Sequence, residues 1–171
     1  MNTELERKSL FLYRRPAGFS LIELLIVVSI ILIIAAIAIP RFLNSKMQAN
    51  ETSAASAART ITTAIVTYQS NFNGGLPPTL AALGPGGGPP TAAAADLIDG
   101  VLASGTKSGY VFVYTPTDIN GDGQFDIFTI NANPSSPGVT GQKYFFTDQT
   151  NVIRFAVGAA ANASSTPIPQ Q

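Results

Sequence analysis

One long run of apolar residues dominates the hydrophobic pattern of this 171-residue chain. Residues 18–40 read GFSLIELLIVVSIILIIAAIAIP, and Glu23 is the one charged side chain among them. A helix formed by residues 19–39 would be about 30 Å long, which matches the hydrocarbon thickness of a bilayer. The alternative is a helix buried in a protein core, but such a helix is rarely apolar on every face over this length. The pattern therefore predicts a transmembrane helix.

Downstream of Pro40 the pattern predicts that the helix continues to about residue 73 with a single apolar face. Pro40 lacks the backbone N–H that a helix interior needs, so we expect a bend or local melting there rather than an end. Asn73-Gly74-Gly75 would end the helix. Apolar residues recur every three or four positions, as is typical of an amphipathic helix: Met47, Ala54, Ala58, Ile61, Ile65, Tyr68 and Phe72.

Residues 74–109 read as a long, variable surface loop. The segment from Gly84 to Pro90 consists of glycine and proline only, which disfavours regular structure. Short helical pieces could form at residues 79–83 and 93–102, where apolar side chains recur. The simplest interpretation is a flexible connection with no function of its own.

Residues 110–157 carry the pattern of a small antiparallel sheet. Aromatic and β-branched residues favour strands at 110–115, 125–130, 143–147 and 151–157. The last two would form a hairpin, and residues 158–171 would be a flexible tail. A sheet of this size needs a helix against it, so we expect an α+β head in which the amphipathic half of the helix packs on the sheet.

Charge and composition limit the classes of function. The chain is 12% charged with zero net charge; residues 1–18 carry +2 and the remainder −2. A weakly acidic chain with scattered cations argues against a nucleic-acid surface. The basic N-terminus should stay in the cytoplasm and the C-terminal part outside. Because the chain has no cysteine, no disulfide can stabilise the head.

Catalytic chemistry finds little support in the sequence. There is no histidine, no cysteine and no G-x-S-x-G motif, so we expect no enzyme activity. Several aromatic residues of the strands could stack on a ligand, but at strand spacing they more often form core and cross-strand pairs. These residues are Tyr110, Phe112, Tyr114, Tyr144, Phe145 and Phe146.

Glu23 is the anomaly within the apolar run, since an ionised carboxylate in hydrocarbon needs a partner. No cation lies in this segment. A cut between Gly18 and Phe19 would create an α-amino group, which could pair with Glu23 of a second copy. The alternative is a protonated Glu23 tolerated near the membrane surface.

These residues resemble the prepilin signature of type IV pilins and of type II secretion pseudopilins. The matching features are a basic leader ending in Gly18, the bulky Phe19, Glu23 four residues later and the apolar helix to Ile39. The resemblance implies removal of leader 1–18 by a prepilin peptidase and N-methylation of Phe19 by the peptidase/methyltransferase. It also implies that Pro40 bends the helix.

The resemblance implies a structural subunit that polymerises through helix 19–39 into a pilus. Its partners would be copies of itself and the inner-membrane assembly machinery. It would reside in the inner membrane before assembly and in a surface pilus or periplasmic pseudopilus afterwards. A pseudopilin is the alternative within the family, and a monomeric membrane-anchored binding module is the alternative outside it. An ordinary signal peptide cut near Ala35, Ala36 and Ala38 is a further alternative for the N-terminus.

A second motif, at residues 118–126, suggests a calcium loop. Oxygen-bearing side chains alternate, and Gly123 at the sixth position would permit a sharp turn. Thr129 stands where an EF-hand has its bidentate Glu, and a plain hairpin turn is the alternative. The candidate Ca²⁺ ligands are Asp118, Asn120, Asp122, Gln124 and Asp126.

Overall fold

The computed structural model describes residues 18–72 and 75–169. Two compact units are present, Met1–Ile39 and Pro40–Gln171. Helix α1, Leu21–Asn71, begins in the first unit and ends in the second. The predicted leader, residues 1–17, and the predicted end of the helix at Asn73-Gly74 lie outside the described residues.

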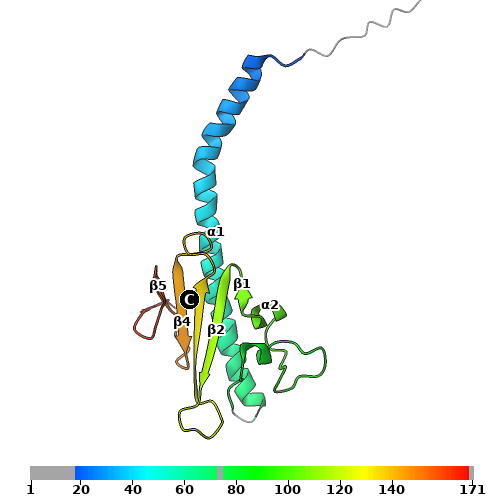
Figure 1. The fold of residues 1–171 in the computed structure, drawn as a ribbon, viewed down its shortest axis with the longest axis vertical. Helices are drawn as coiled ribbons and strands as arrows, with labels where there is room; N and C mark the ends of the chain where they lie inside the picture. Colours follow the sequence, from blue (N-terminus) through cyan, green and yellow to red (C-terminus); the bar gives the residue numbers. More distant parts are fainter. Residues whose placement is uncertain (1–17, 73–74, 170–171) are drawn as a thin grey trace, which may run out of the picture. The chain divides into compact units, whose positions relative to one another are not determined.

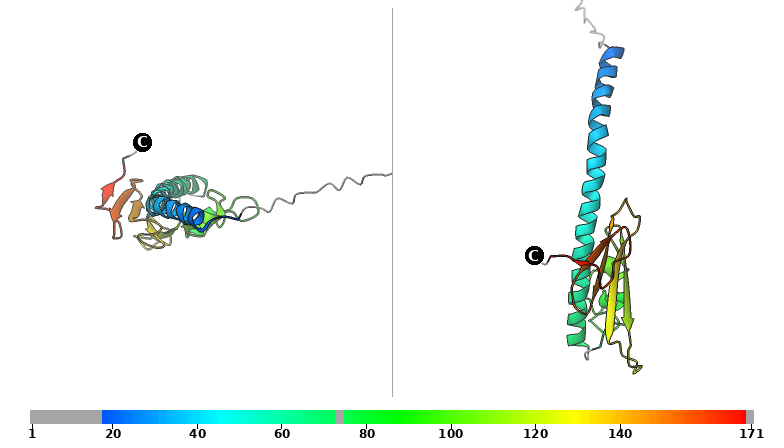
Figure 2. Two further views of the ribbon diagram at one scale, coloured as in Figure 1. Left: turned by 90° about the horizontal axis from the view of Figure 1, so that it is seen from above. Right: turned by 90° about the vertical axis from the view of Figure 1, so that its left-hand side faces the viewer.

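In the second unit, which we call the head, α1 packs against one face of a six-stranded antiparallel sheet (Figures 1 and 2). The predicted α+β architecture is therefore confirmed. Neighbouring strands follow one another along the chain, so that the sheet is a simple meander. The strands are β1 Thr106–Lys107, β2 Tyr110–Thr117, β3 Ile127–Pro134, β4 Lys143–Asp148, β5 Arg154–Val157 and β6 Thr166–Pro167.

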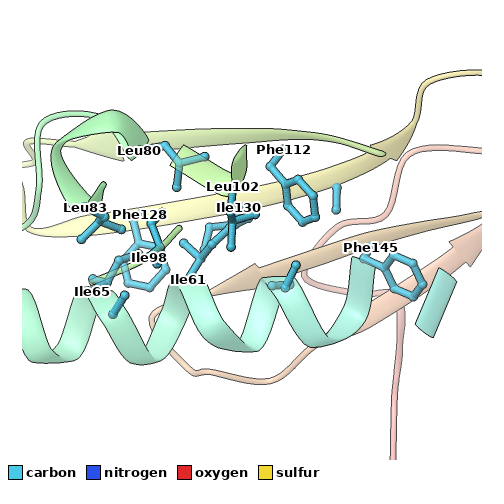
Figure 3. Close-up of a cluster of buried hydrophobic side chains, with 14 of the residues drawn as sticks. Ile61, Ile65, Leu80, Leu83, Ile98, Leu102, Phe112, Phe128, Ile130 and Phe145 are labelled. Carbon is cyan, nitrogen blue, oxygen red and sulfur yellow. The ribbon is translucent and has the colours of Figure 1, made fainter. Parts of the chain in front are cut away.

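The core lies between the amphipathic part of α1 and the sheet (Figure 3). Buried alanine side chains of α1, among them Ala54 and Ala58, belong to this core. Ile61 and Ile65 are fully buried there, among Phe128 and Ile130 of β3. Each buried isoleucine contributes about 2 kcal/mol through removal of apolar surface from water. The predicted apolar stripe is thus the surface that the sheet covers.

The sheet extends beyond residues 110–157 at both ends. β1 adds an edge before Tyr110, and β6 adds one within the segment predicted to be a loose tail. Ala161 is buried, and the Ile168 N–H donates to the Ile153 carbonyl at 2.8 Å. Residues 158–169 are therefore not the loose tail that their composition suggested, because Ala161 and Ile168 have apolar surface to cover.

The connection between α1 and β1 is also more than a surface loop. Apolar residues of this connection enter the core: Leu76, Leu80, Leu83, Ile98 and Leu102. The predicted helical pieces are present as a 3-10 turn, η1 Leu80–Leu83, and as α2 Gly100–Ala103, which is shorter than predicted. Its glycine- and proline-rich centre, residues 85–93, is exposed throughout.

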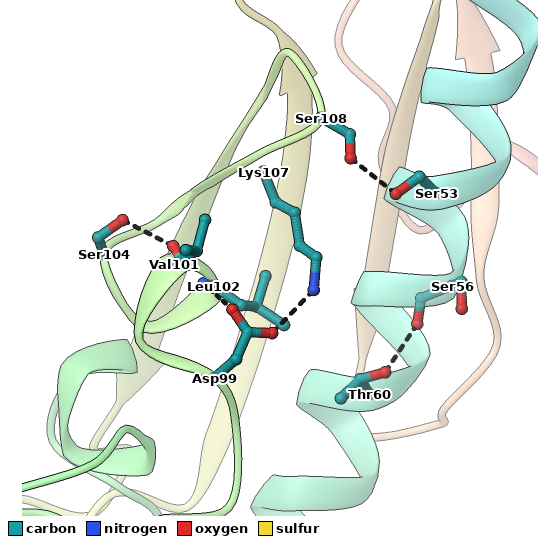
Figure 4. Close-up of polar contacts among 9 residues, drawn as sticks. All are labelled: Ser53, Ser56, Thr60, Asp99, Val101, Leu102, Ser104, Lys107 and Ser108. Atoms are coloured by element: carbon teal, nitrogen blue, oxygen red, sulfur yellow. Dashed lines mark hydrogen bonds and ion pairs between the residues drawn. The ribbon is translucent and has the colours of Figure 1, made fainter.

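Polar contacts fix the end of this connection (Figure 4). The Asp99 carboxylate accepts the Leu102 N–H at the start of α2 and lies 2.8 Å from the Lys107 ammonium group. The Ser108 hydroxyl lies 2.8 Å from that of Ser53 on α1. The Asp99–Lys107 pair ties the connection to β1, and the Ser108–Ser53 contact ties the turn between β1 and β2 to the helix.

Candidate processing and assembly site

The Gly18–Phe19 peptide bond lies just before α1, which begins at Leu21. Gly18 is exposed, and an added Cβ would meet nothing within 4 Å. Phe19 is 90% exposed. Within the described residues, the space around Gly18 gives no steric reason for glycine at this position, and cleavage after Gly18 stays a prediction.

Ser20 and Glu23 form a reciprocal pair at the start of α1. The Glu23 Oε2 atom accepts the Ser20 N–H at 2.9 Å, and the Glu23 N–H donates to the Ser20 Oγ atom at 3.3 Å. This arrangement is a capping box, which satisfies backbone N–H groups that a helix start leaves unpaired. Sequence analysis missed it, although the spacing Ser20-x-x-Glu23 is the usual signal.

The capping box gives Glu23 a local role in addition to the predicted pairing between copies. A carboxylate in the first helical turn also interacts favourably with the positive end of the helix dipole. Glu23 is thus held at the N-terminal end of α1, four residues from Phe19. The predicted ion pair with the Phe19 amine of a second copy stays a prediction.

The part of α1 that follows Glu23 has the length and composition of a membrane span. Within residues 19–39 the large apolar side chains are exposed in the isolated chain, with values from 44% for Val28 to 90% for Phe19. Lipid, or other copies of the same helix, would remove this surface from water.

Pro40 lies inside α1 without interrupting it. The local melting that the sequence suggested is therefore not observed. The bend at Pro40 stays a prediction.

The loop at residues 118–126, which we call the hairpin tip, connects β2 to β3. The Asp118 carboxylate accepts backbone N–H groups of Asn120, Gly121 and Gly123 at 3.2, 2.7 and 2.9 Å. These hydrogen bonds hold the pKa of Asp118 below its ordinary value, and the bond from the Gly123 N–H has the largest effect. Gly121 and Gly123 have φ angles of 78° and 85°, which suit glycine.

Four of the five proposed calcium ligands, Asp118, Asn120, Asp122 and Asp126, accept backbone N–H groups of the hairpin tip with their side chains. Asn120 and Asp122 accept bonds from Asp122 and Gln124, and Asp126 accepts one from Ile119. Across residues 18–72 and 75–169, no three His, Cys, Asp or Glu side chains are placed to hold one metal ion. The calcium hypothesis stays a prediction.

Two helix residues that sequence analysis did not single out connect α1 to the loop before β4. Buried Glu51 accepts the N–H groups of Gln142 and Lys143 at 2.9 and 3.3 Å and lies 3.1 Å from the Lys143 ammonium group. The Asn50 amide donates to the Thr140 carbonyl at 3.0 Å. No local signal marks these partners, because they lie 90 to 92 residues away.

Comparison with known families supports the N-terminal assignment. Residues 13–39 match the prokaryotic N-terminal methylation motif. Comparisons with curated proteins and with solved structures found no match. The matched residues include Gly18, Phe19 and Glu23, together with the whole apolar part of α1.

The chain therefore carries the prepilin-type signal that distinguishes type IV pilins and pseudopilins, on a pilin-like α+β fold. The motif marks a structural protein of a class that is usually non-enzymatic. It supports anchoring in a membrane, processing by a prepilin peptidase and pilus-type assembly.

Proposed function

We propose that this protein is a type IV pilin-like structural subunit that polymerises through α1 into a pilus filament. The supporting observation is the methylation motif at residues 13–39, most of which lies in α1. The C-terminal part of the same helix packs on the sheet of a pilin-like head. In this proposal the prepilin peptidase cuts between Gly18 and Phe19, and Phe19 is then N-methylated.

The N-terminal helix supplies the surface for polymerisation. Its apolar residues are compatible with lipid before assembly and with other copies of the helix afterwards. The inner-membrane assembly machinery would transfer the subunit from one environment to the other. The filament would serve adhesion, motility or a related surface function. The matched motif is shared with pseudopilins of type II secretion, which form the alternative.

Mass spectrometry of membrane-extracted protein tests the processing step. We expect a chain that begins at Phe19 and carries one methyl group, about 14 Da above the unmodified mass by the chemistry of methylation. Gly18→Trp should accumulate as precursor, whereas Gly75→Trp, at an open position downstream, should be processed normally. A product that begins at Met1 or after Ile39 would contradict the proposal.

Imaging of cells with an antibody to the head tests polymerisation. Long surface fibres that contain the processed chain are expected. Processed protein confined to the membrane as a monomer would instead support a membrane-anchored binding module. Short periplasmic assemblies would support the pseudopilin.

A further inference from the structure

A groove opens in the head between α1 on one side and β4, β5 and the residues that follow β6 on the other. Its volume is about 620 Å³, within the roughly 300–1,000 Å³ of typical binding sites. One face of α1 supplies a wall through Gln48, Thr52, Ala55 and Arg59. The apolar floor consists of Phe145, Phe155 and Ile168. We call this feature the α1 groove.

Positive charge predominates on the rim of the α1 groove. Lys143 and Arg59 both line it, and among the described residues that line it Glu51 is the one with a carboxylate. Glu51 pairs with Lys143. Arg59 is exposed, and its guanidinium has no carboxylate partner within residues 18–72 and 75–169. The groove therefore suits a partner with an apolar group beside negative charge.

The hairpin tip of the same protein has these properties. Ile119 is 66% exposed, although it is a large apolar side chain. Asp118 directly precedes Ile119, and Asp122 and Asp126 follow it within seven residues. Residues 118–126 contain no lysine or arginine. The Asp126 carboxylate accepts the Ile119 N–H at 2.8 Å, so the backbone that carries this apolar side chain is held in place.

The α1 groove and the hairpin tip cannot meet within one molecule. β2 and β3 pair from Tyr110 with Pro134 to Thr117 with Ile127, and the hairpin tip follows at the Thr117 end. The groove residue Lys143 lies at the opposite end, where its carbonyl accepts the Tyr110 hydroxyl. Eight residues of strand separate the two ends by about 26 Å. Figure 1 shows the hairpin tip at one end of the sheet.

We propose that the hairpin tip of one copy inserts Ile119 into the α1 groove of the next copy, with its carboxylates facing Arg59 and Lys143. This proposal rests on the proposed function, since it describes how heads join within the filament. The contact uses two different surfaces, so each copy offers one of each. Repetition of such a heterologous contact produces an open chain of subunits when the rotation does not close a ring.

Disulfide cross-linking of the full-length protein in its own cells tests this contact, because the natural chain contains no cysteine. Ile119→Cys is combined with Thr52→Cys, which lies in the α1 groove. The control combines Ile119→Cys with Val66→Cys, which is 48% exposed on α1 but does not line the groove. Chelator is present during the cross-linking, so that no metal ion neutralises the three carboxylates of the hairpin tip.

The first pair should give a ladder of dimers, trimers and longer multimers on non-reducing gels, whereas the control pair should give background only. Adding Arg59→Glu should reduce the ladder by about fivefold, the scale of an exposed charge pair, and adding Asp122→Lys as well should restore it. A ladder no stronger than the control, or one that Arg59→Glu leaves unchanged, would overturn the proposal.

Fibre imaging of the same cells separates this inference from the proposed function. Fibres without the Ile119–Thr52 cross-link would overturn the contact and leave the proposed function in place. Absence of both processed chains and fibres in the unmodified protein would contradict the proposed function itself.

Discussion

Glu51 is the residue that best shows how the head holds together without a disulfide. Burial by itself raises the pKa of Glu51, but the N–H groups of Gln142 and Lys143 and the Lys143 ammonium group outweigh this effect. The pKa of Glu51 therefore lies below its ordinary value of 4.5. A carboxylate with a lowered pKa stabilises the folded state above the ordinary pKa and loses this contribution as the pH falls through the lowered value.

Glu51→Ala should lower the free energy of unfolding by about 1 to 3 kcal/mol at pH 7, because two backbone donors and an ammonium group lose their acceptor. Glu51→Gln should cost less, since its amide oxygen can still accept a hydrogen bond. Urea unfolding of the head fragment 45–171 between pH 7 and pH 3 measures both effects. The difference between wild type and Glu51→Gln should shrink toward pH 3; a constant difference would exclude a role for the charge.

The hairpin tip allows a second test at the scale of single residues. If Ca²⁺ binds, it replaces repulsion among Asp118, Asp122 and Asp126 with attraction to one ion. We expect Ca²⁺ to raise the melting temperature of the head fragment relative to chelator, and Asp122→Ala to remove the rise. Magnesium at the same concentration controls for ionic strength, because it dehydrates reluctantly. Identical melting curves with Ca²⁺ and with chelator would contradict the calcium hypothesis and show that the hairpin tip is an ordinary turn.

At the scale of elements, the loop between β3 and β4 packs closely on β2 at Gly141. Gly141 is buried, and a Cβ there would collide with the ring and hydroxyl of Tyr110. That hydroxyl donates to the Lys143 carbonyl at 2.8 Å. Glycine is therefore required at position 141 by the approach of two elements rather than by its own backbone angles.

Gly141→Ala should destabilise the head by about 1 to 3 kcal/mol, because the Tyr110 ring must move and its hydrogen bond weaken. Gly88→Ala is the matched control, since a Cβ at that exposed position meets nothing within 4 Å, and its effect should stay within about 0.5 kcal/mol. Denaturant unfolding compares the two variants. Equal stability of both would contradict the close packing of this loop on β2.

At the scale of the whole molecule, Glu23 combines a local bond with the predicted pairing between copies. Glutamine can replace glutamate in a capping box, so Glu23→Gln keeps the start of α1 while removing the charge. Glutamine cannot form an ion pair with the Phe19 amine of a neighbouring copy. The variant therefore separates helix capping from charge pairing.

We expect Glu23→Gln to be processed and inserted normally but to yield at most about a tenth of the wild-type fibres, since loss of one partner from a desolvated ion pair costs more than 1.4 kcal/mol. Quantification of sheared fibres against total processed protein measures this ratio. Ser29→Ala, which removes a hydroxyl that donates to the Leu25 carbonyl, is the control within the apolar helix. Wild-type fibre yield in Glu23→Gln would rule out the pairing role.

The features that the sequence by itself determined are those that depend on contiguous residues. The apolar run, the small Gly18, the bulky Phe19 and Glu23 define a linear motif, and the family match covers the same segment. The positions of β2 to β5 followed, to within a few residues, from local runs of aromatic and β-branched residues. The stripe on α1 predicted which face the sheet would cover, because helical geometry alone places those residues together.

The tertiary structure decided everything that depends on which elements meet. Leu83 and Leu102 lie in a segment that the sequence predicted to be a surface connection, and the folded structure buries both side chains in the core. Glu51 looked like a solvent-facing charge, because the backbone N–H groups that donate to it lie 91 and 92 residues away. The α1 groove forms only because β4, β5 and the residues that follow β6 lie beside α1. Such contacts leave no periodic trace in a sequence, since their energy comes from surfaces that folding alone brings together.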